Sequence, residues 1–151
     1  MYLSVHGSAA LAIARFIPNP IIAFLASLLS HLMLDFIPHG DEFLTDTNDH
    51  NKNMKRLLGA AMIDGAVLVI FILVFIALYP TMSLSLMLIS LLGGLLPDIL
   101  QGVYLISKPR WLKGFDAMHT SLHNMPGHKI RWQVGMLVQC LTFTALWVLF
   151  I

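Results

Sequence analysis

The amino-acid sequence predicts an all-α fold: an integral membrane bundle of about five helices, arranged as two helical hairpins and a C-terminal helix. Hydrophobic residues make up 58% of the 151 residues, charged residues only 11%, and the mean hydropathy is +0.80. A soluble domain is nearer half apolar and a quarter charged. Long apolar runs alternate with short proline-containing turns. The length suits a single domain, residues 1–151.

The first hairpin is predicted over residues 2–17 and 21–37, with Pro18-Asn19-Pro20 as its turn. Its first helix is rich in glycine, serine and alanine, which allow close packing of helices in lipid. The polar residues 39–53 are expected to form a loop.

The second hairpin is predicted over residues 54–78 and 83–105, with a turn at Tyr79-Pro80-Thr81. A second polar segment, residues 107–130, contains a candidate short helix around residues 114–124. The last helix is expected over residues 132–151. We find no low-complexity tract that would indicate a further domain.

Basic residues gather in the two long polar segments or at the helix ends beside them. The positive-inside rule therefore predicts that both segments are cytoplasmic, although the first hairpin can be either spanning or re-entrant. The net charge is only +1 and forms no basic stripe, so nucleic acid is not an expected partner. The single cysteine, Cys140, excludes an internal disulfide.

The densest group of polar residues closes the second predicted helix. His31 and Asp35 are four residues apart, so on a helix they lie on one face. Pro38 and Gly40 are expected to end the helix and let His39 fold back toward that face. We interpret this stretch as part of a metal site. The alternative is a helix end with solvated polar residues.

Distances from the two hairpin turns predict which polar residues share a level. His6 and His31 lie about 13 and 12 residues from the first turn, and Asp64 and Asp98 about 17 residues from the second. Each pair should therefore sit at one depth on adjacent helices. A carboxylate inside a spanning helix usually faces a cavity, a partner or an ion. The alternative for Asp64 is a structural hydrogen bond, and for Asp98 a helix kink or cap.

The second polar segment adds His119 and His123, whose four-residue spacing suits two ligands on one helical face. His50 and His128 are interpreted as surface residues. The pooled ligands are His6, His31, Asp35, His39, Asp64, Asp98, His119 and His123. This set is too large for one tetrahedral zinc and fits two or three metal ions with bridging carboxylates. Imidazole and carboxylate favour zinc, with manganese or iron as alternatives.

These motifs resemble the bacterial membrane-bound metal-dependent hydrolase family. The residues that carry the resemblance are His6, His31, Asp35, Pro38, His39, the Leu96-Pro97-Asp98 run and the late His119-Thr-Ser-Leu-His123 run. The histidine-aspartate-histidine core is also similar to that of zinc-dependent phospholipase C and the single-strand-specific zinc nucleases. Those all-helical enzymes cleave phosphodiesters with three clustered zinc ions. The resemblance implies a bacterial inner-membrane protein, and the positive-inside rule predicts that its site faces the cytoplasm.

The leading functional hypothesis is hydrolysis of a phosphoester in a phospholipid or lipid-linked substrate by a metal-activated water. Asp35 is expected to bridge metal ions and Asp41 or Glu42 to act as general base, and phosphate is expected to contact Ser121, Lys129 and Arg131. One alternative is a transporter of divalent cations or protons. Another is a non-catalytic membrane protein stabilised by metal. The partners expected are the lipid bilayer and the substrate, and the sequence leaves the oligomeric state open.

Overall fold

The computed structural model describes residues 1–40, 44, 48–124 and 130–150. Within these residues the secondary structure is entirely helical, which confirms the predicted all-α class. The elements are α1 (Leu3–Phe16), α2 (Pro20–Asp35), α3 (His50–Leu78), α4 (Leu84–Ser107), the short 3-10 helix η2 (Arg110–Leu112), α5 (Lys113–Asn124) and α6 (Trp132–Phe150). Helix α5 is the candidate short helix of the second polar segment, so the described residues form six α-helices where about five were predicted.

Polar caps explain where two of these helices begin. The Asn19 side chain accepts hydrogen bonds from the backbone N–H groups of Ile21 and Ile22, and Pro20 occupies the first turn of α2. Asp49 caps α3 in the same way, so this helix begins four residues earlier than expected, at His50. The end of α4 is marked by Lys108, whose φ of 46° is left-handed.

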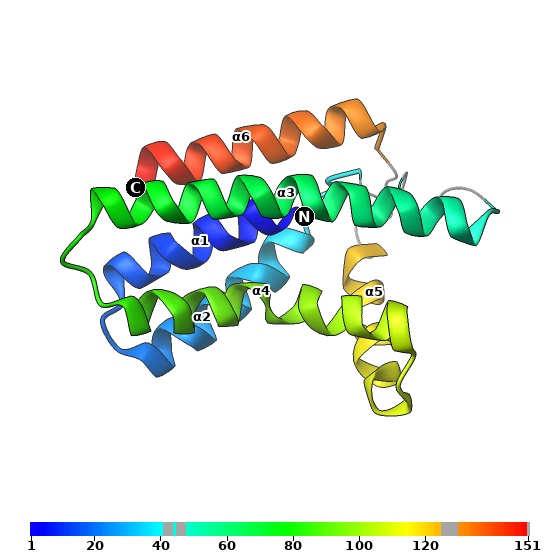
Figure 1. Ribbon diagram of the computed structural model, residues 1–151, viewed down its shortest axis with the longest axis horizontal. Coiled ribbons are helices and arrows are strands. Elements are labelled where there is room, and N and C mark those ends of the chain that lie inside the picture. Colours follow the sequence, from blue (N-terminus) through cyan, green and yellow to red (C-terminus); the bar gives the residue numbers. More distant parts are fainter. Residues whose placement is uncertain (41–43, 45–47, 125–129, 151) are drawn as a thin grey trace.

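Helix α1 is central, because it packs against α2, α3, α4 and α6 (Figure 1). Small residues allow these close approaches. A Cβ atom on Gly93 of α4 would overlap the backbone of Phe24 on α2, and one on Gly94 would press on Ala10 of α1. A Cβ atom on Gly7 of α1 would overlap the Leu68 side chain on α3. The glycine pair that interrupts the sequence of α4 is therefore a packing feature.

Helix α2 has its polar face inside and its apolar face outside. Its buried residues follow a four-residue spacing: Ala23, Ser27, His31 and Asp35. The opposite face carries an exposed apolar stripe at the same spacing: Ile21, Leu25, Leu29 and Met33. This arrangement reverses that of a helix on the surface of a soluble protein. It suits a helix that faces hydrocarbon and turns its polar side chains toward the protein interior.

Two helices, α3 and α4, are long and apolar enough to cross a membrane, whereas α2 and α6 are apolar but shorter. Large apolar side chains remain exposed on both long helices, among them Met62 at 75%, Ile63 at 72% and Ile106 at 73%. Such faces are expected to contact lipid or another apolar partner.

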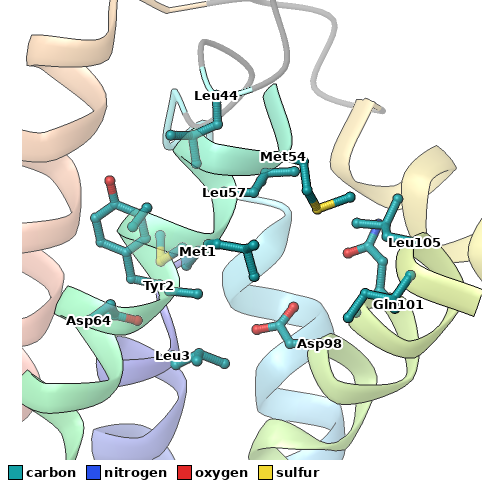
Figure 2. Close-up of a pocket in the computed structure, with 15 residues that line it drawn as sticks. Met1, Tyr2, Leu3, Leu44, Met54, Leu57, Asp64, Asp98, Gln101 and Leu105 are labelled. Atoms are coloured by element: carbon teal, nitrogen blue, oxygen red, sulfur yellow. The ribbon is translucent and has the colours of Figure 1, made fainter. Parts of the chain in front are cut away.

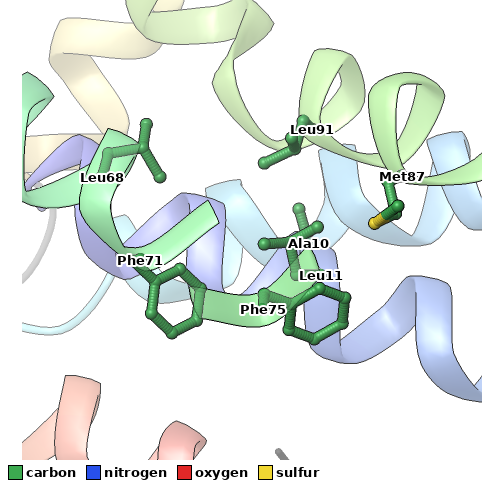
Figure 3. Packing of buried hydrophobic residues seen from close by; sticks show 7 residues of the cluster. All are labelled: Ala10, Leu11, Leu68, Phe71, Phe75, Met87 and Leu91. Carbon is green, nitrogen blue, oxygen red and sulfur yellow. The ribbon is translucent and has the colours of Figure 1, made fainter. Parts of the chain in front are cut away.

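The α3–α4 hairpin is open at one end and closed at the other. At the open end, remote from the turn, a cavity of about 250 Å³ lies between the two helices (Figure 2). At the end near the turn, side chains of α1, α3 and α4 pack together in an apolar cluster (Figure 3). Its members are Ala10, Leu11, Leu68, Phe71, Phe75, Met87 and Leu91. The polar residues described next all lie toward the open end.

Candidate metal centre

Asp35, the last residue of α2, lies at the centre of the buried polar cluster. Its Oδ1 atom is 3.1 Å from His6 Nε2 and 2.5 Å from the amino nitrogen of Met1. Its Oδ2 atom faces three other imidazoles, with Nε2 distances of 3.0 Å to His31, 3.2 Å to His119 and 3.1 Å to His123. The side chain is fully buried. Oδ1 is therefore paired with the Met1 amino group and one imidazole, whereas Oδ2 is surrounded by three imidazoles.

The helices bring these imidazoles together from three directions. Helix α1 supplies His6, α2 supplies His31, and α5 supplies His119 and His123 from successive turns of one face. The rings of His6 and His31 stack with their centroids 3.8 Å apart, which confirms that they share one level. Phe115, one turn before His119 on α5, stacks on the His119 ring at 5.7 Å and packs against its face.

Three of the histidines use their Nδ1 atoms as hydrogen-bond donors to oxygen. His31 Nδ1 donates to the carbonyl of Gly94 at 2.7 Å, and His39 Nδ1 donates to the carbonyl of Ile37 at 2.7 Å. His119 Nδ1 donates to Gln101 Oε1 at 3.0 Å. In a neutral imidazole the other nitrogen then carries a lone pair. Each ring consequently presents Nε2 to the cluster as an acceptor or a metal ligand.

With these tautomers, the atoms at the centre of the cluster are acceptors that face one another, and no N–H donor of the described residues lies between them. The Nε2 atoms of His31 and His119 are 3.3 Å apart, and both carry lone pairs. Among the described residues, Asp35 Oδ2 has no hydrogen-bond donor of suitable geometry, despite its three imidazole neighbours. Facing lone pairs and a buried carboxylate oxygen require a positive charge between them, either a proton on one Nε2 atom or a metal cation. A bound cation satisfies this requirement.

The distances between donor atoms also fit a metal ion. Bonds of about 2.0–2.2 Å in a tetrahedral zinc site place the ligand atoms roughly 3.3–3.6 Å from one another. Two of the corresponding distances here are 3.0 Å, between His31 Nε2 and Asp35 Oδ2, and 3.7 Å, between His31 Nε2 and Asp98 Oδ1. The potential ligand atoms of His31, Asp35, Asp98 and His119 all lie within 4.8 Å of one another. The donor set and its spacing are therefore compatible with a bound metal ion.

The donors fall into two groups that share Asp35. One group consists of His31, Asp35, Asp98 and His119, and the other of Asp35, His39 and His123. Within each group the potential ligand atoms all lie within 4.8 Å of one another. His6 adjoins the first group, since its Nε2 atom lies between Asp35 and Asp98. Each of the two groups could hold a metal ion.

Asp98 approaches the cluster from α4, on the side facing the cavity. Its two oxygens lie 3.7 Å from His31 Nε2 and 4.0 Å from His6 Nε2. Its side chain is 20% exposed, whereas the side chains of Asp35, His6 and His31 are fully buried. Figure 2 shows the Asp98 carboxylate pointing into the cavity between α3 and α4. Asp98 thus lies between the buried imidazoles and an open space.

Asp64 lies at the edge of the cluster and has a different environment from the other predicted ligands. Its carboxylate accepts hydrogen bonds from the backbone N–H of Ser4, at 3.2 and 3.3 Å, and from the Ser4 hydroxyl. These contacts join α3 to the first turn of α1. In the part of the chain that the structure describes, Asp64 belongs to neither group of potential ligands. Its contacts correspond to the alternative interpretation, a structural hydrogen bond.

The His39 backbone is held in place by α6. Gly40 has a φ of +70°, and Gly135 of α6 packs so closely that a Cβ atom there would overlap the His39 carbonyl. Gln139, one turn further along α6, is 3% exposed and donates through Nε2 to the same carbonyl at 3.2 Å. Its Oε1 atom accepts from the backbone N–H of Tyr2 at 2.8 Å. Gln139 therefore connects α6 to His39 and to the start of α1.

Sequence reasoning missed Gln101 and Gln139 as supporting residues. Gln139 is an amide within the otherwise apolar run of α6, and Gln101 follows Asp98 by three residues. Both are polar residues in apolar helices, and this signal was available without a structure.

The proposed proton-transfer and phosphate-contacting residues lie mostly outside the described part of the chain. Asp41, Glu42 and Lys129 are not described, nor is His128, and nothing is described of the His50 side chain. Ser121 and Arg131 are exposed. Their roles remain predictions.

The cluster as a whole can hold cations beside an open, partly apolar cavity. Such a site can bind an anionic group at its exposed side, next to Asp98, once the charge of the carboxylates is offset. Comparisons with known proteins add no family assignment, because no protein-family model, curated protein or solved structure matches this chain.

Proposed function

We propose that the protein is a membrane-embedded metal-dependent hydrolase that cleaves a phosphoester bond in a lipid or lipid-linked substrate. The observation that carries this proposal is the position of Asp35, whose buried carboxylate lies within 3.2 Å of four imidazole nitrogens, one at Oδ1 and three at Oδ2. Carboxylate-bridged pairs of cations are typical of enzymes that transfer or hydrolyse phosphoryl groups. Zinc fits the donor set best, with manganese and iron as alternatives.

When bound, a divalent cation supplies Lewis acidity, which polarises a phosphoryl oxygen and acidifies water enough for attack near neutral pH. The protein supplies the arrangement that makes this acidity useful. His31, His39 and His119 are held in one tautomer by their Nδ1 hydrogen bonds, which aim their Nε2 atoms into the cluster. The Met1 amino group lies 3.0 Å from His39 Nε2 and would have to move for this ring to bind a metal ion. Asp98, at the open side, is the ligand that lies nearest to an entering substrate. Asp41 or Glu42 is proposed as the general base.

A lipid substrate is supported by the surroundings of the site. The cluster lies at one end of α3 and α4, the two helices able to cross a membrane, and α2 beside it presents an apolar stripe outward. The basic residues of the flanking polar segments support a cytoplasmic position for this end, by the positive-inside rule. A phosphate at headgroup level could then enter the site without leaving the bilayer.

A transport function receives less support. A conduction path needs polar groups along the whole thickness of the membrane. Here the end near the α3–α4 turn is closed by the apolar cluster that contains Phe71, Phe75 and Met87. The polar residues of the cluster gather at the other end, which suits a reaction site better than a passage.

The experiment that tests the proposal is elemental analysis combined with hydrolysis of a phosphodiester and a phosphatidic acid by the purified protein. We expect at least one tightly bound metal ion per chain, and we expect Asp35→Asn to lose both the metal and the activity. Asp49→Asn is the matched control, because asparagine caps a helix as well as aspartate does. A wild-type protein that holds metal but cleaves neither substrate would refute the hydrolase function while leaving the metal centre intact.

A further inference from the structure

The cavity between α3 and α4 is an apolar cleft with one polar end. Its α3 wall includes Leu57, Ala60 and Ala61, and its α4 wall includes Leu105 and Ile106. Most of its lining is aliphatic, and Figure 2 shows Leu57 and Leu105 on opposite sides of the open space. The cleft cannot extend far toward the helical turn, because Leu68 and Leu91 belong to the cluster that closes that end.

The polar end of the cleft belongs to the metal centre. Asp98 lines the cleft and also belongs to the ligand group that contains His31 and His119. Gln101, one turn further along α4, lines the cleft as well and accepts the hydrogen bond from His119 Nδ1. The cleft and the candidate reaction site are therefore continuous, and they share two side chains.

The opposite side of the cleft is bordered by surfaces that suit hydrocarbon. Leu58 and Ile106, both in the cleft lining, are 50% and 73% exposed, so the lining continues onto the outer faces of α3 and α4. Both helices are able to cross a membrane. The cavity volume of about 250 Å³ corresponds to roughly eight groups of the size of a water molecule or a methylene, at about 30 Å³ each.

We propose that this cleft binds one hydrocarbon chain of a phosphate-bearing lipid and places its phosphate beside Asp98. The inference rests on the proposed phosphoesterase function and extends it by naming the part of the fold that selects a lipid. A chain entering between α3 and α4 would come directly from the bilayer. Its polar end would meet the first carboxylate of the metal centre without crossing the apolar walls.

Gly102 allows this cleft to be blocked without disturbing the fold. It lines the cleft on α4, and a Cβ atom built on it meets no atom within 4 Å. A phenylalanine at this position would project into free space and occupy the path of the chain. Gly59 on α3 is equally unobstructed but does not line the cleft, so Gly59→Phe is the matched control.

The test uses a phosphatidic acid that carries a photoactivatable diazirine on one acyl chain, incorporated into phosphatidylcholine nanodiscs with the full-length protein. A methyl ester of the same fatty acid serves as the probe without phosphate. After illumination, labelled peptides are mapped by mass spectrometry. We expect the phosphatidic acid to label the cleft walls, residues 54–61 and 102–106, above the outward-facing stripe of α2. The methyl ester should label all lipid-facing surfaces evenly.

Blocking the cleft decides the outcome. In Gly102→Phe, labelling of the cleft walls by phosphatidic acid should fall to the level of the α2 stripe, whereas in Gly59→Phe it should remain unchanged. The proposal would be overturned if phosphatidic acid labelled the cleft walls equally in the two variants. It would also be overturned if both probes labelled the cleft walls of the wild-type protein equally. Hydrolysis of the water-soluble p-nitrophenyl phosphate is measured in parallel. Turnover without cleft labelling refutes the lipid cleft alone, and cleft labelling with hydrolysis of neither this ester nor the phosphodiester nor phosphatidic acid refutes the hydrolase function alone.

Discussion

The Nε2 atoms of His31 and His119 face each other at 3.3 Å, although both rings use Nδ1 as a hydrogen-bond donor. Two lone pairs at this distance repel, and burial removes the water that would separate them. The carbonyl of Gly94 and the side chain of Gln101 accept the two Nδ1 hydrogen bonds, and so they orient the Nε2 lone pairs toward each other. Backbone and amide groups that orient a ligating histidine in this way are characteristic of metal sites. Four predictions follow from particular contacts.

The first concerns Gln101. Replacing it with leucine removes the acceptor for His119 Nδ1 while keeping a similar side-chain size, so the imidazole can rotate or change tautomer. Loss of such a supporting hydrogen bond typically weakens metal binding about 10- to 100-fold. We expect this loss in a competition titration with a chromophoric chelator. Gln101→Glu keeps an acceptor oxygen and should bind metal at least as tightly as wild type. Identical affinity of Gln101→Leu and wild type would contradict the role assigned to Gln101.

The second prediction concerns removal of metal. Without a metal ion, the Met1 ammonium still pairs with Asp35 Oδ1, but Asp35 Oδ2 and the facing imidazole lone pairs are buried without a partner among the described residues. A chelator should therefore lower the free energy of unfolding by about 3 kcal/mol when free metal had been about 100 times its Kd. Thermal unfolding in detergent, with and without chelator, measures this shift. The Asp35→Asn variant is the control and should unfold at the same temperature in both conditions.

The third prediction concerns Gly135 on α6. A methyl group there would overlap the carbonyl of His39 and the backbone of Gly40, so Gly135→Ala must push α6 away from the cluster. We expect a loss of about 1–3 kcal/mol in unfolding free energy, the usual cost of overpacking. Gly59→Ala meets open space within a helix and should instead stabilise the protein by about 0.5–1 kcal/mol. Chemical or thermal unfolding of the two variants distinguishes these effects.

The helices and the level of the site could be predicted from local patterns. Four-residue spacing places His31 with Asp35 and His119 with His123, because helix geometry alone determines which residues share a face. Counting residues from the first turn placed His6 level with His31, and their rings stack. Both inferences need only the rise and period of an α-helix.

Contacts that depend on the rotation of each helix about its axis, or on which helices pack together, could not be predicted from the sequence. Counting from the second turn placed Asp64 and Asp98 at one depth, and both line the same cavity. Depth does not determine the rotation of a helix about its axis, and only Asp98 joins a group of potential ligands. Likewise, Gln139 contacts a residue 100 positions away, His39, and no local pattern encodes that pairing.

The fourth prediction tests the placement of Asp64. Its carboxylate accepts from the backbone and hydroxyl of Ser4, and an asparagine side-chain oxygen can accept the same hydrogen bonds. Asp64→Asn should therefore retain the wild-type metal content, in contrast to Asp35→Asn. Ser4→Ala removes the hydroxyl donor from a buried carboxylate and should destabilise the protein by about 1–3 kcal/mol, again without loss of metal. Elemental analysis decides between the two assignments, because loss of metal in Asp64→Asn would make Asp64 a ligand.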